Sequence, residues 1–467
     1  MVTREHPAPG TEEEQDMTRS SRSQFPKGLI LLVAFAMIAA ACGSSTTDTT
    51  AGATPDTTAA AGTPDTTAAS STPDTTAAAA PSGDPIVIGS TLALTGFLAP
   101  TAAIHKVAGD LFVKQLNDNG GLLGRQVEWV VLDDESVPDT AASLYERLIT
   151  EDGVDAIIGP YGTGTITAAM QVAERYGYVM PQHTGSLTYT YGYDCQFPSW
   201  PAGRNPNVTN SELVYDALES TGTPPESIAF VINQFPGTMY VAYGQPDTDE
   251  GGAVSIAEDR GYNVVLDINY PSNTTDWGPI AAQVRDADPD FLFLGALGVD
   301  GPNLIAAMDA LDYQVPGMFL QWPAPGPMLG AGDSADGAMS VTAFEPHPPF
   351  TDDPGYAAIA QAFSDAATAA GLPYTAFETQ ASASWAAWQI LVAGIEGAGS
   401  LDQAAACDYL LNNTIDTVFG PVDFDPDQNN YYGDLSYVKQ IQNGDWVVVW
   451  PADGAPDGVS VQYSPEG

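Results

Sequence analysis

The sequence has very few basic residues. Its 467 residues include 13 Lys and Arg against 59 Asp and Glu, which gives a formal net charge of -46. Proteins that bind nucleic acid neutralise phosphate charges with Lys and Arg, so this composition excludes nucleic acid as a partner. From Asp84 onward, 9 basic residues stand against 50 acidic ones. The part of the chain that is expected to fold is therefore strongly acidic.

Histidine and the common catalytic motifs are also scarce. The four histidines show no metal-ligand spacing: His6, His105, His183 and His347. The sequence contains no G-x-S-x-G turn and no H-E-x-x-H helix. We therefore expect no metal, no cofactor and no enzymatic activity, and for His183 we expect a hydrogen-bonding role at the surface.

The long apolar run of a membrane span is missing from the N-terminal region. The segment from Gly28 to Ala41 has fourteen apolar or small residues behind a basic stretch. As a helix it would reach about 21 Å, whereas the hydrocarbon core of a bilayer is about 30 Å thick. Its length and flanks are typical of a signal peptide over residues 1–41. Because acidic residues precede Met17 and a basic stretch follows it, we expect translation to start there.

Cys42 follows this apolar segment directly. A Cys after small residues at the end of a signal resembles the lipobox of bacterial lipoproteins, in which the thiol is lipidated and becomes the mature N-terminus. The sequence departs from that pattern at Ala39, where Leu is usual. The resemblance implies a lipid on Cys42, and a lone Cys in an ordinary signal peptide is the alternative.

Residues 42–83 form a low-complexity segment of Ser, Thr, Ala, Asp and Pro. The sequence T-P-D-T-T-A-A occurs three times at a period of nine residues, and no aromatic residue is present. Such a segment cannot bury enough apolar surface to offset the entropy of ordering it. About 40 flexible residues span roughly 35 Å, so we expect a tether that holds a folded domain away from a membrane surface.

From Pro85 onward, short β-branched runs alternate with helical patterns. Strands are expected over 86–92, 127–132 and 154–158, with helices between them and another helix from about 165 to 175. The same rhythm restarts later, with strands expected over 228–232, 264–268, 291–294 and 318–320. Repeated strand–helix–strand units predict parallel sheets covered by helices. The expected fold class is α/β, with two doubly wound, Rossmann-like lobes.

The turn after the third expected strand has the composition of an anion-binding site. It reads G-P-Y-G-T-G-T from Gly159 to Thr165 and leads into a helix. Ligands of open α/β sheets gather at the carboxyl ends of strands, and a helix N-terminus offers free backbone N–H groups. Tyr161 and Thr163 are therefore candidate ligand contacts, and helix capping by Thr163 is the alternative. Thr184 and Ser186 supply a second hydroxyl-rich loop after the next strand.

Five motifs occur in an order that resembles a known family: T-L-A-L-T-G-F from Thr91, N-D-N-G-G-L-L-G-R from Asn117, L-D-D-E from Leu132, D-A-I-I-G-P from Asp155 and F-G-P-V-D-F-D-P-D from Phe419. They resemble the branched-chain amino-acid-binding (Leu/Ile/Val-type) substrate-binding proteins of ABC importers, which have the type I periplasmic binding protein fold. The resemblance runs from about Asp84 to the C-terminal strands.

The resemblance implies two lobes joined by three hinge crossings, with the ligand trapped by hinge closure. Lobe 1 is expected over 84–204 and 345–430, and lobe 2 over 205–344 and 431–467. By motif, Thr163 takes the place of the hydroxyl residue that holds the ligand carboxylate. Thr184 and Ser186 match the neighbouring loop that helps to hold the same ligand.

The second lobe matches the family less well. The resemblance implies a Tyr after its first strand, for which Tyr243 or Tyr240 is the candidate, and it places Trp322 beside the cleft. The acidic residue that would meet an α-ammonium group falls on Pro323. A buried ammonium without that carboxylate lacks its partner. An amide, a carboxylate or an aromatic ligand therefore remains open beside an amino acid.

Cys195 and Cys407 remain once Cys42 is lipidated. An even pair in an exported domain predicts a disulfide, and the resemblance places both residues in lobe 1; two buried free thiols are the alternative. The chain as a whole is predicted to be a monomeric, lipid-anchored, extracytoplasmic solute-binding protein that delivers a small ligand to an ABC permease. A sensory binding module that reports to a signalling partner is the alternative.

Overall fold

The computed structural model describes residues 82–183, 185, 191–203, 205–245, 251–426, 430 and 432–465. The expected signal peptide and tether lie outside these residues, and so does Cys42. Thr184 and Ser186, the expected second ligand loop, are also outside them. None of the described helices combines the length and the apolar character that a bilayer span requires.

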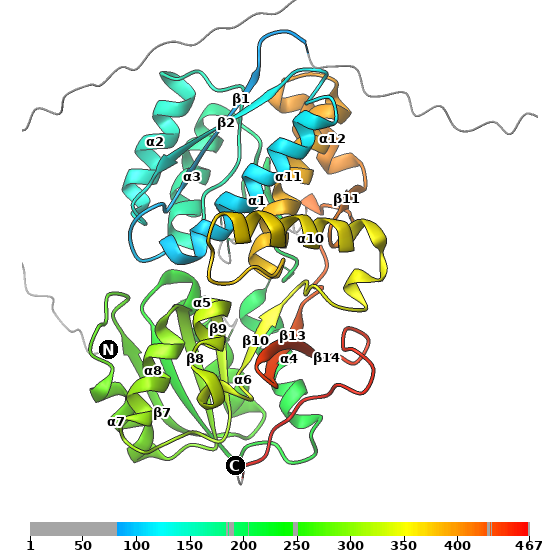
Figure 1. Ribbon diagram of the computed structural model, residues 1–467. Helices are drawn as coiled ribbons and strands as arrows, with labels where there is room; N and C mark the ends of the chain where they lie inside the picture. The colour runs from blue at the N-terminus through cyan, green and yellow to red at the C-terminus, as the bar shows by residue number, and fades with distance from the viewer. Residues whose placement is uncertain are drawn as a thin grey trace, which may run out of the picture. The chain divides into compact units, whose positions relative to one another are not determined.

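The described chain folds into two α/β lobes, which lie one above the other in Figure 1. The elements of the first lobe, drawn at the top, come from both ends of the chain: β1 (Ile86–Leu92), α1 (Ala99–Asp118), β2 (Val127–Asp133), α2 (Pro138–Thr150), β3 (Ala156–Ile157), α3 (Thr163–Tyr176), β4 (Met180–Gln182), β5 (Gln196–Pro198), α10 (Pro354–Ala369), α11 (Thr379–Ala398), α12 (Gln403–Asn412), β11 (Ile415–Thr417) and β12 (Gly420–Val422).

The second lobe is built from the middle of the chain and two C-terminal strands. Its elements are α4 (Pro206–Glu219), β6 (Ser227–Asn233), α5 (Pro236–Tyr243), α6 (Ala253–Asp259), β7 (Asn263–Tyr270), α7 (Gly278–Ala287), β8 (Phe291–Gly298), α8 (Asp300–Asp309), β9 (Met318–Pro323), α9 (Pro325–Leu329), the 3-10 turn Gly332–Ala335, β10 (Met339–Thr342), β13 (Tyr437–Gln442) and β14 (Asp445–Trp450). A further 3-10 turn, Phe350–Asp352, lies between β10 and α10.

The first lobe has a parallel sheet in the order β2-β1-β3 and a separate parallel pair of β4 and β5. Alternate residues of β1 pack on opposite faces, as the strand period of two requires. Ile86 and Ile88 pack against α1 and α11, while Val87 packs on the side of α2 and α3. Helices therefore cover both faces of this sheet, and the predicted doubly wound arrangement is confirmed.

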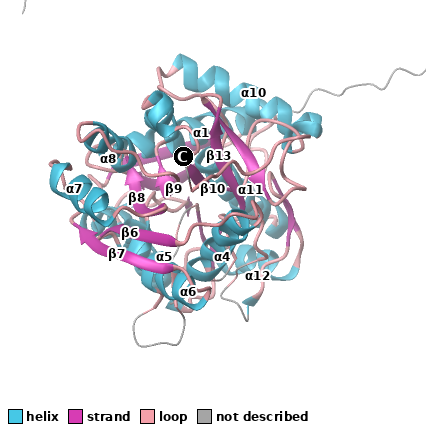
Figure 2. Cartoon of the chain, turned by 90° about the horizontal axis from the view of Figure 1, so that it is seen from below, coloured by secondary structure: helices cyan, strands magenta, loops and turns pink. Residues whose placement is uncertain are grey.

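The second lobe has a seven-stranded sheet in the order β14-β13-β10-β9-β8-β6-β7. Its strands from β10 to β7 pair in parallel, whereas β13 pairs antiparallel with both β10 and β14. In β6, Phe230 belongs to the core under α4, α5 and α6, and Val231 belongs to the core under α7 and α8. Figure 2 shows these two groups of helices on the two sides of the strands.

The chain crosses between the lobes three times. It crosses between β5 and α4, between β10 and α10, and between β12 and β13. A bridge between Ala202 and Asp434 joins the first crossing to the third. The crossings agree with the two-lobe fold, and the lobe boundaries at 204, 344 and 430 stay predictions.

Some elements differ in extent from those that the sequence predicts. Helix α3 begins at Thr163 rather than near residue 165, because Gly162 at φ 97° and ψ 136° ends the extended segment there. Strand β8 reaches Gly298 and β9 reaches Pro323. The carboxyl ends of both strands thus lie on the side of the sheet that faces the first lobe, where the predicted site lies.

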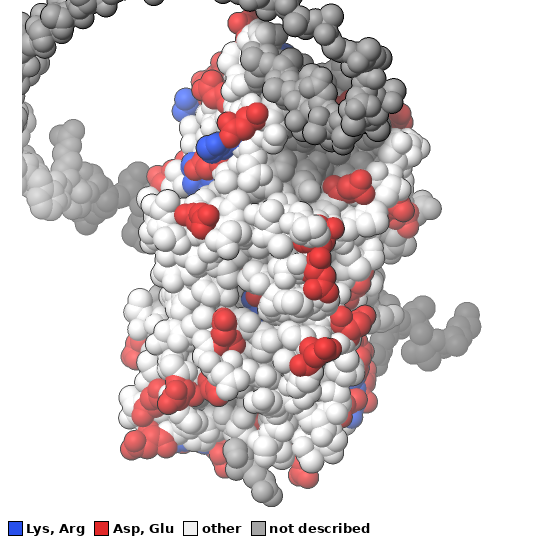
Figure 3. Space-filling view, turned by 45° about the vertical axis from the view of Figure 1, so that its right-hand side comes forward, with Lys and Arg blue, Asp and Glu red and all other residues white. Residues whose placement is uncertain are grey.

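The acidic excess of the sequence lies largely on the surface. Figure 3 shows Asp and Glu side chains scattered over one face among uncharged residues, with few Lys or Arg. Arg260 contacts the carboxylates of Glu212, Asp216 and Glu219 at once. Exposed ion pairs of this kind contribute little to stability, so the charge bears mainly on solubility.

Candidate functional site

The strand order of each sheet predicts where a ligand would bind. In the first lobe, β1 lies between β2 and β3, so the loops after β1 and β3 leave the sheet in opposite directions. In the second lobe, β6 lies between β7 and β8 in the same way. Crevices of α/β sheets form at the carboxyl ends of strands at such switch points. The loops after β1, β3, β6 and β8 are therefore the expected walls of a site.

The structure brings residues of these loops together across the two lobes. The cleft between them is lined by Leu98, Tyr161, Gly162, Thr163, Trp200, Phe235, Leu297, Trp322 and Gln380. None of these nine side chains is charged. They enclose about 20 Å³, which is room for about one water molecule.

The turn between β3 and α3 forms the polar corner of the cleft. Gly162 has φ 97°, and a Cβ atom on it would lie 2.7 Å from Cδ1 of Leu98, so only glycine fits. The hydroxyl of Thr165 donates to the backbone oxygens of Tyr161 and Gly162, at 2.5 and 2.8 Å. Thr163 follows as the first residue of α3 and is 2% exposed. Backbone N–H groups at the start of α3 and the Thr163 hydroxyl thus occupy one corner, where an anion is favoured.

Aromatic rings form the opposite wall. Trp200, on the first crossing, and Trp322, on β9, have ring centroids 6.0 Å apart at 72°. Phe235 precedes α5 and meets Phe97 of the first lobe edge to face, at 6.3 Å. The Nε1 atom of Trp322 is buried and has no hydrogen-bond acceptor among the described residues. The wall therefore offers apolar ring surface and one buried N–H donor.

A layer of buried polar side chains supports the cleft from behind. The ring of His105 stacks on that of His183 at 4.2 Å, and its centroid lies 4.5 Å from that of Tyr161 with the rings tilted by 31°. Nε2 of His105 lies 3.1 Å from Oε1 of Gln380, to which it donates. This layer connects α1, α11 and the ends of β3 and β4. It fixes Tyr161 and Gln380, both of which face the cleft.

His183 is buried, at 3% exposure, so the expectation of a surface role for it is wrong. Burial lowers its pKa to about 3. Burial and the neighbouring His183 ring lower the pKa of His105, against the opposing effect of its bond to Gln380. Both rings are therefore neutral near pH 7. The cleft has no positive charge on its described residues, so an anion would be held there by dipoles and hydroxyls.

This histidine pair predicts a loss of stability in mild acid. The unfolded chain binds protons at each histidine near pH 6.5, whereas the folded pKa values are depressed. The contribution of the neutral histidines to the free energy of unfolding is therefore fully present above pH 6.5, and it falls as the pH drops below 6.5. The slope is about 1.4 kcal/mol per pH unit for each histidine. Urea unfolding of the wild type between about pH 6 and pH 5 is expected to lose about 2–3 kcal/mol.

Substituted chains assign that loss to residues. His183→Gln is expected to lose about half of the pH slope, since one titrating ring remains. Equal slopes in the wild type and in His183→Gln would contradict the assignment.

The structure brings together three of the six residues that the sequence and the resemblance predict to contact the ligand. Tyr161, Thr163 and Trp322 line the cleft, while Thr184 and Ser186 lie outside the described residues. Tyr243 does not reach the cleft. Its hydroxyl donates to Oδ1 of Asp267 at 2.6 Å and lies 3.0 Å from Oδ1 of Asn269, on the outer strand β7. Tyr243 ends α5, and that helix points away from the cleft.

The alternative candidate, Tyr240, is buried in the core of the second lobe at 3% exposure. The residue that this part of the chain places in the cleft is Phe235, at the start of α5. The Phe235-Pro236 pair directly after strand β6 is the sequence signal that marks it, because a helix begins at the carboxyl end of its strand. Trp200 and Gln380 carried no comparable signal, since Trp200 lies on the first crossing and Gln380 at the start of α11, which does not directly follow a strand.

Cys195 and Cys407 form a disulfide, with sulfur atoms 2.04 Å apart. It joins the segment before β5 to helix α12 within the first lobe. In the described part of the chain, no three or more His, Cys, Asp or Glu side chains are placed to hold a metal ion.

Comparisons with known proteins agree with this architecture. The model of the periplasmic binding protein family matches residues 85–445. A leucine-, isoleucine-, valine-, threonine- and alanine-binding protein of Pseudomonas aeruginosa is 23% identical over 358 residues, which are 74% of this chain and 87% of that protein. BasB, the substrate-binding protein of a chemotactic signal transduction system in Halobacterium salinarum, is 35% identical over 232 residues. Those residues are 46% of this chain and 51% of BasB, so the match spans about half the length of that relative.

A solved structure shows the same fold. The solute-binding protein of an ABC transporter from R. palustris, in complex with benzoate, superposes with a TM-score of 0.65 at 20% identity. The match covers 81% of this chain and 99% of that one. The two lobes, the three crossings and the cleft at the switch points are those of a type I periplasmic binding protein. The family model covers most of the chain, and the resemblance read from the motifs is confirmed: this protein belongs to the periplasmic binding protein family.

Proposed function

We propose that this protein is the extracytoplasmic solute-binding component of an ABC importer, and that it captures a small organic carboxylate with an aromatic or apolar body. One observation carries the proposal: the cleft combines the polar corner at Thr163 with the aromatic wall of Trp200, Phe235 and Trp322, and its nine described lining side chains are uncharged. The carboxylate would accept hydrogen bonds at the start of α3. The ring or apolar body would lie against the wall.

The same lining argues against an α-amino acid as the preferred ligand. A buried ammonium group requires a carboxylate or several oxygen acceptors to replace its water. Gln380 is the one side chain of the described lining with a carbonyl oxygen, and His105 already donates to it. The hydroxyls of Tyr161 and Thr163 are acceptors too, but they carry no negative charge that could replace a carboxylate. The benzoate complex of the R. palustris protein supports an aromatic acid. The Pseudomonas aeruginosa relative, described as binding leucine and other amino acids, keeps that class as the alternative.

The N-terminal region completes the proposal. A lipid on Cys42 and the Thr- and Pro-rich tether over 42–83 would hold the binding lobes at the outer face of the cell membrane. The ligand would then pass to an ABC permease. BasB supports a second role as a sensory binding protein. Deleting an adjacent permease separates these roles, because uptake of the ligand stops for an importer and continues for a sensor.

Binding measurements on the purified chain test the ligand class. By isothermal titration calorimetry, benzoate is expected to bind with one-to-one stoichiometry and to be recovered unchanged. Isoleucine is expected to bind at least about tenfold more weakly, since its ammonium has no partner. Tighter binding of isoleucine than of benzoate would contradict the choice of ligand.

Thr163→Val tests the position of the site. The substitution keeps the volume and removes the hydroxyl, so the affinity for benzoate is expected to fall about tenfold to a hundredfold, as for loss of a hydrogen bond to a charged group. Thr150→Val is the matched control, because the Thr150 hydroxyl is exposed and donates to the backbone oxygen of Glu146 within its own helix, α2. If both variants bind benzoate like the wild type, the carboxylate does not bind at the start of α3.

A further inference from the structure

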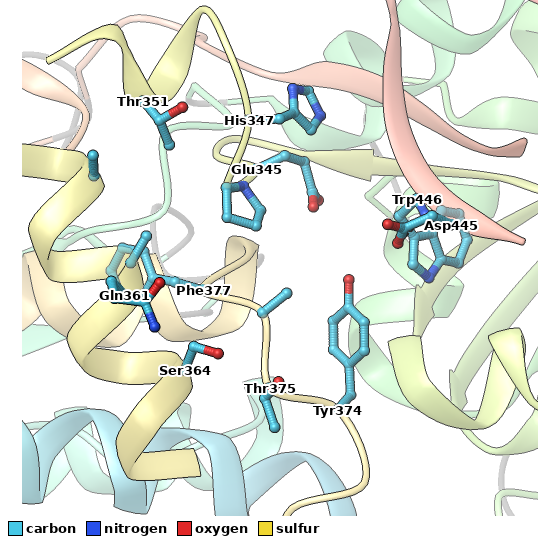
Figure 4. A pocket seen from close by; sticks show the side chains of 14 residues that line it. Glu345, His347, Thr351, Gln361, Ser364, Tyr374, Thr375, Phe377, Asp445 and Trp446 are labelled. Atoms are coloured by element: carbon cyan, nitrogen blue, oxygen red, sulfur yellow. Dashed lines mark hydrogen bonds between the residues drawn. The ribbon is translucent and has the colours of Figure 1, made fainter. Parts of the chain in front are cut away.

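A second cavity lies beside the second crossing, away from the cleft. Its volume is about 540 Å³, within the range of small-molecule sites. Its walls come from the segment after β10, from helix α10, from the loop before α11 and from the start of β14. It shares no lining residue with the cleft at Thr163. Figure 4 shows its side chains pointing into a common space. We call it the hinge pocket.

A buried carboxylate faces this pocket with one oxygen unpaired. Glu345 lines the pocket and is 1% exposed. Its Oε1 accepts from Nζ of Lys439 at 2.7 Å and from the hydroxyl of Thr342 at 2.8 Å. Its Oε2 is buried and has no donor among the described residues. A buried carboxylate oxygen without a donor loses the hydrogen bonds that water would have given it, so this oxygen is suited to receive a donor from a ligand.

Two further side chains with oxygen atoms, those of Tyr374 and Asp445, line the hinge pocket. The hydroxyl of Tyr374 points toward the carboxylate of Glu345, and the carboxylate of Asp445 lies across the opening from it (Figure 4). Burial and the negative charges of Glu345, Glu378 and Asp445 raise the pKa of the Tyr374 phenol, so its hydroxyl stays protonated. The indole of Trp446 also lines the pocket beside Asp445. The Trp446 ring already faces the ammonium of Lys439 at 5.0 Å, so it is the oxygen acceptors that favour a cation in the pocket.

The balance of charge around the pocket is negative. Among the described residues, Lys439 is the one cation that contacts the buried carboxylates beside the pocket. Its ammonium is shared by Glu345 and Glu378. Asp445 adds another carboxylate at the rim, where among the described residues it accepts from the backbone N–H of Trp446. An anionic ligand would meet carboxylates here and would be repelled. An organic ammonium ion would meet Oε2 of Glu345, the Tyr374 oxygen and Asp445.

We propose that the hinge pocket is a second ligand site, which binds a small organic ammonium ion through Glu345, Tyr374 and Asp445. The ammonium donates to the three oxygens, and the apolar part of the ligand lies against the alanine residues of α10. Helix α10 belongs to the first lobe and β14 to the second, so the ligand contacts both lobes and the crossing that joins them. A ligand with different contacts in the open and closed forms shifts the balance between those forms. This site therefore couples ammonium binding to opening of the cleft.

Butylammonium, titrated by NMR into the full chain, is the test. It is expected to bind in competition with other alkylammonium ions, whereas butanol and butyrate, of similar size, are expected not to bind. Asp445→Asn and Tyr374→Phe are each expected to lower the affinity for butylammonium at least about fivefold, through loss of one polar contact. Asp259→Asn removes an equal charge from the exposed end of α6 and is expected to leave the affinity unchanged.

Other outcomes would overturn the proposal. If Asp259→Asn and Asp445→Asn weaken binding equally, butylammonium is attracted only by the acidic surface. If butanol binds as tightly as butylammonium, the cavity is an apolar void. Thr163→Val is expected to leave the affinity for butylammonium intact, which separates this site from the cleft. If saturating butylammonium leaves the affinity for benzoate within about twofold, the two sites are not coupled.

Discussion

Replacing Lys439 with Met is expected to lower the free energy of unfolding by about 3–5 kcal/mol, as for a broken buried ion pair. Nζ of Lys439 lies 2.7 Å from Oε1 of Glu345 and 3.4 Å from Oε2 of Glu378. These three side chains are between 1% and 3% exposed. Without the ammonium, two carboxylates would face each other in the interior with no counter-charge. Met keeps most of the volume of the lysine chain, so the expected loss comes from charge more than from packing.

The pKa shifts in this cluster agree with that expectation. The two carboxylates raise the pKa of Lys439, although burial alone would lower it. Burial raises the pKa of Glu378, and the charge of Lys439 offsets only part of that increase. The ammonium is therefore held in its charged form by its partners. Its contribution to stability is present below the unfolded pKa of Lys and is lost as the pH rises through the higher folded value.

A triple substitution supplies the control. In Lys439→Met, Glu345→Gln, Glu378→Gln, the carboxylates become neutral amides, and more than half of the lost stability is expected to return. Urea unfolding monitored by tryptophan fluorescence gives the free energy of unfolding of the wild type, of Lys439→Met and of the triple variant. A loss below about 1 kcal/mol in Lys439→Met would mean that water reaches the cluster. A triple variant as unstable as the single one would assign the loss to packing.

The cluster also marks what the sequence could not predict. Glu345 follows β10, Glu378 precedes α11 and Lys439 lies on β13, so the three residues meet only when all the crossings are formed. No local pattern connects them. The strands and helices around them were predictable, because β-branched runs and helical spacing act within about twenty residues. Contacts made across crossings depend on the angle between the lobes, which no periodicity encodes.

The residues of the candidate site also fall into two groups, those that local sequence predicts and those that depend on contacts between distant segments. The turn from Gly159 to Thr165 was predictable, because its glycines and threonines act locally on the strand end and on the first turn of α3. Neither Tyr240 nor Tyr243 lines the cleft, because the two residues are neighbours on α5 and both pack on the core of the second lobe. The pair of His105 and His183 was missed since the two residues are 78 positions apart in the sequence. No local sequence pattern indicates that the two rings stack in the folded protein.

The disulfide between Cys195 and Cys407 is expected to contribute about 2–5 kcal/mol to stability. The two residues are 212 positions apart, and the loop that they close contains most of the second lobe. A cross-link over so long a loop removes many conformations from the unfolded chain, and this effect grows slowly with loop length. In the folded lobe the bond also holds the segment before β5 against α12, where Met180 of β4 donates its backbone N–H to the oxygen of Cys195 at 3.1 Å.

Cys195→Ala, Cys407→Ala is therefore expected to lower the midpoint of thermal unfolding by several degrees, in proportion to the lost free energy. Wild-type protein kept reduced is the matched control, because it lacks the bond but keeps both sulfur atoms. If the cross-link is the cause, the reduced protein and the double variant unfold at nearly the same temperature. A reduced protein as stable as the oxidised one would place the effect in the packing of Val179, Phe197 and Leu410 around the sulfur atoms. Since β4 leads into His183, whose ring stacks on that of His105 behind the cleft, the double variant should also bind benzoate more weakly. The reduced protein separates this loss from a change in side-chain volume.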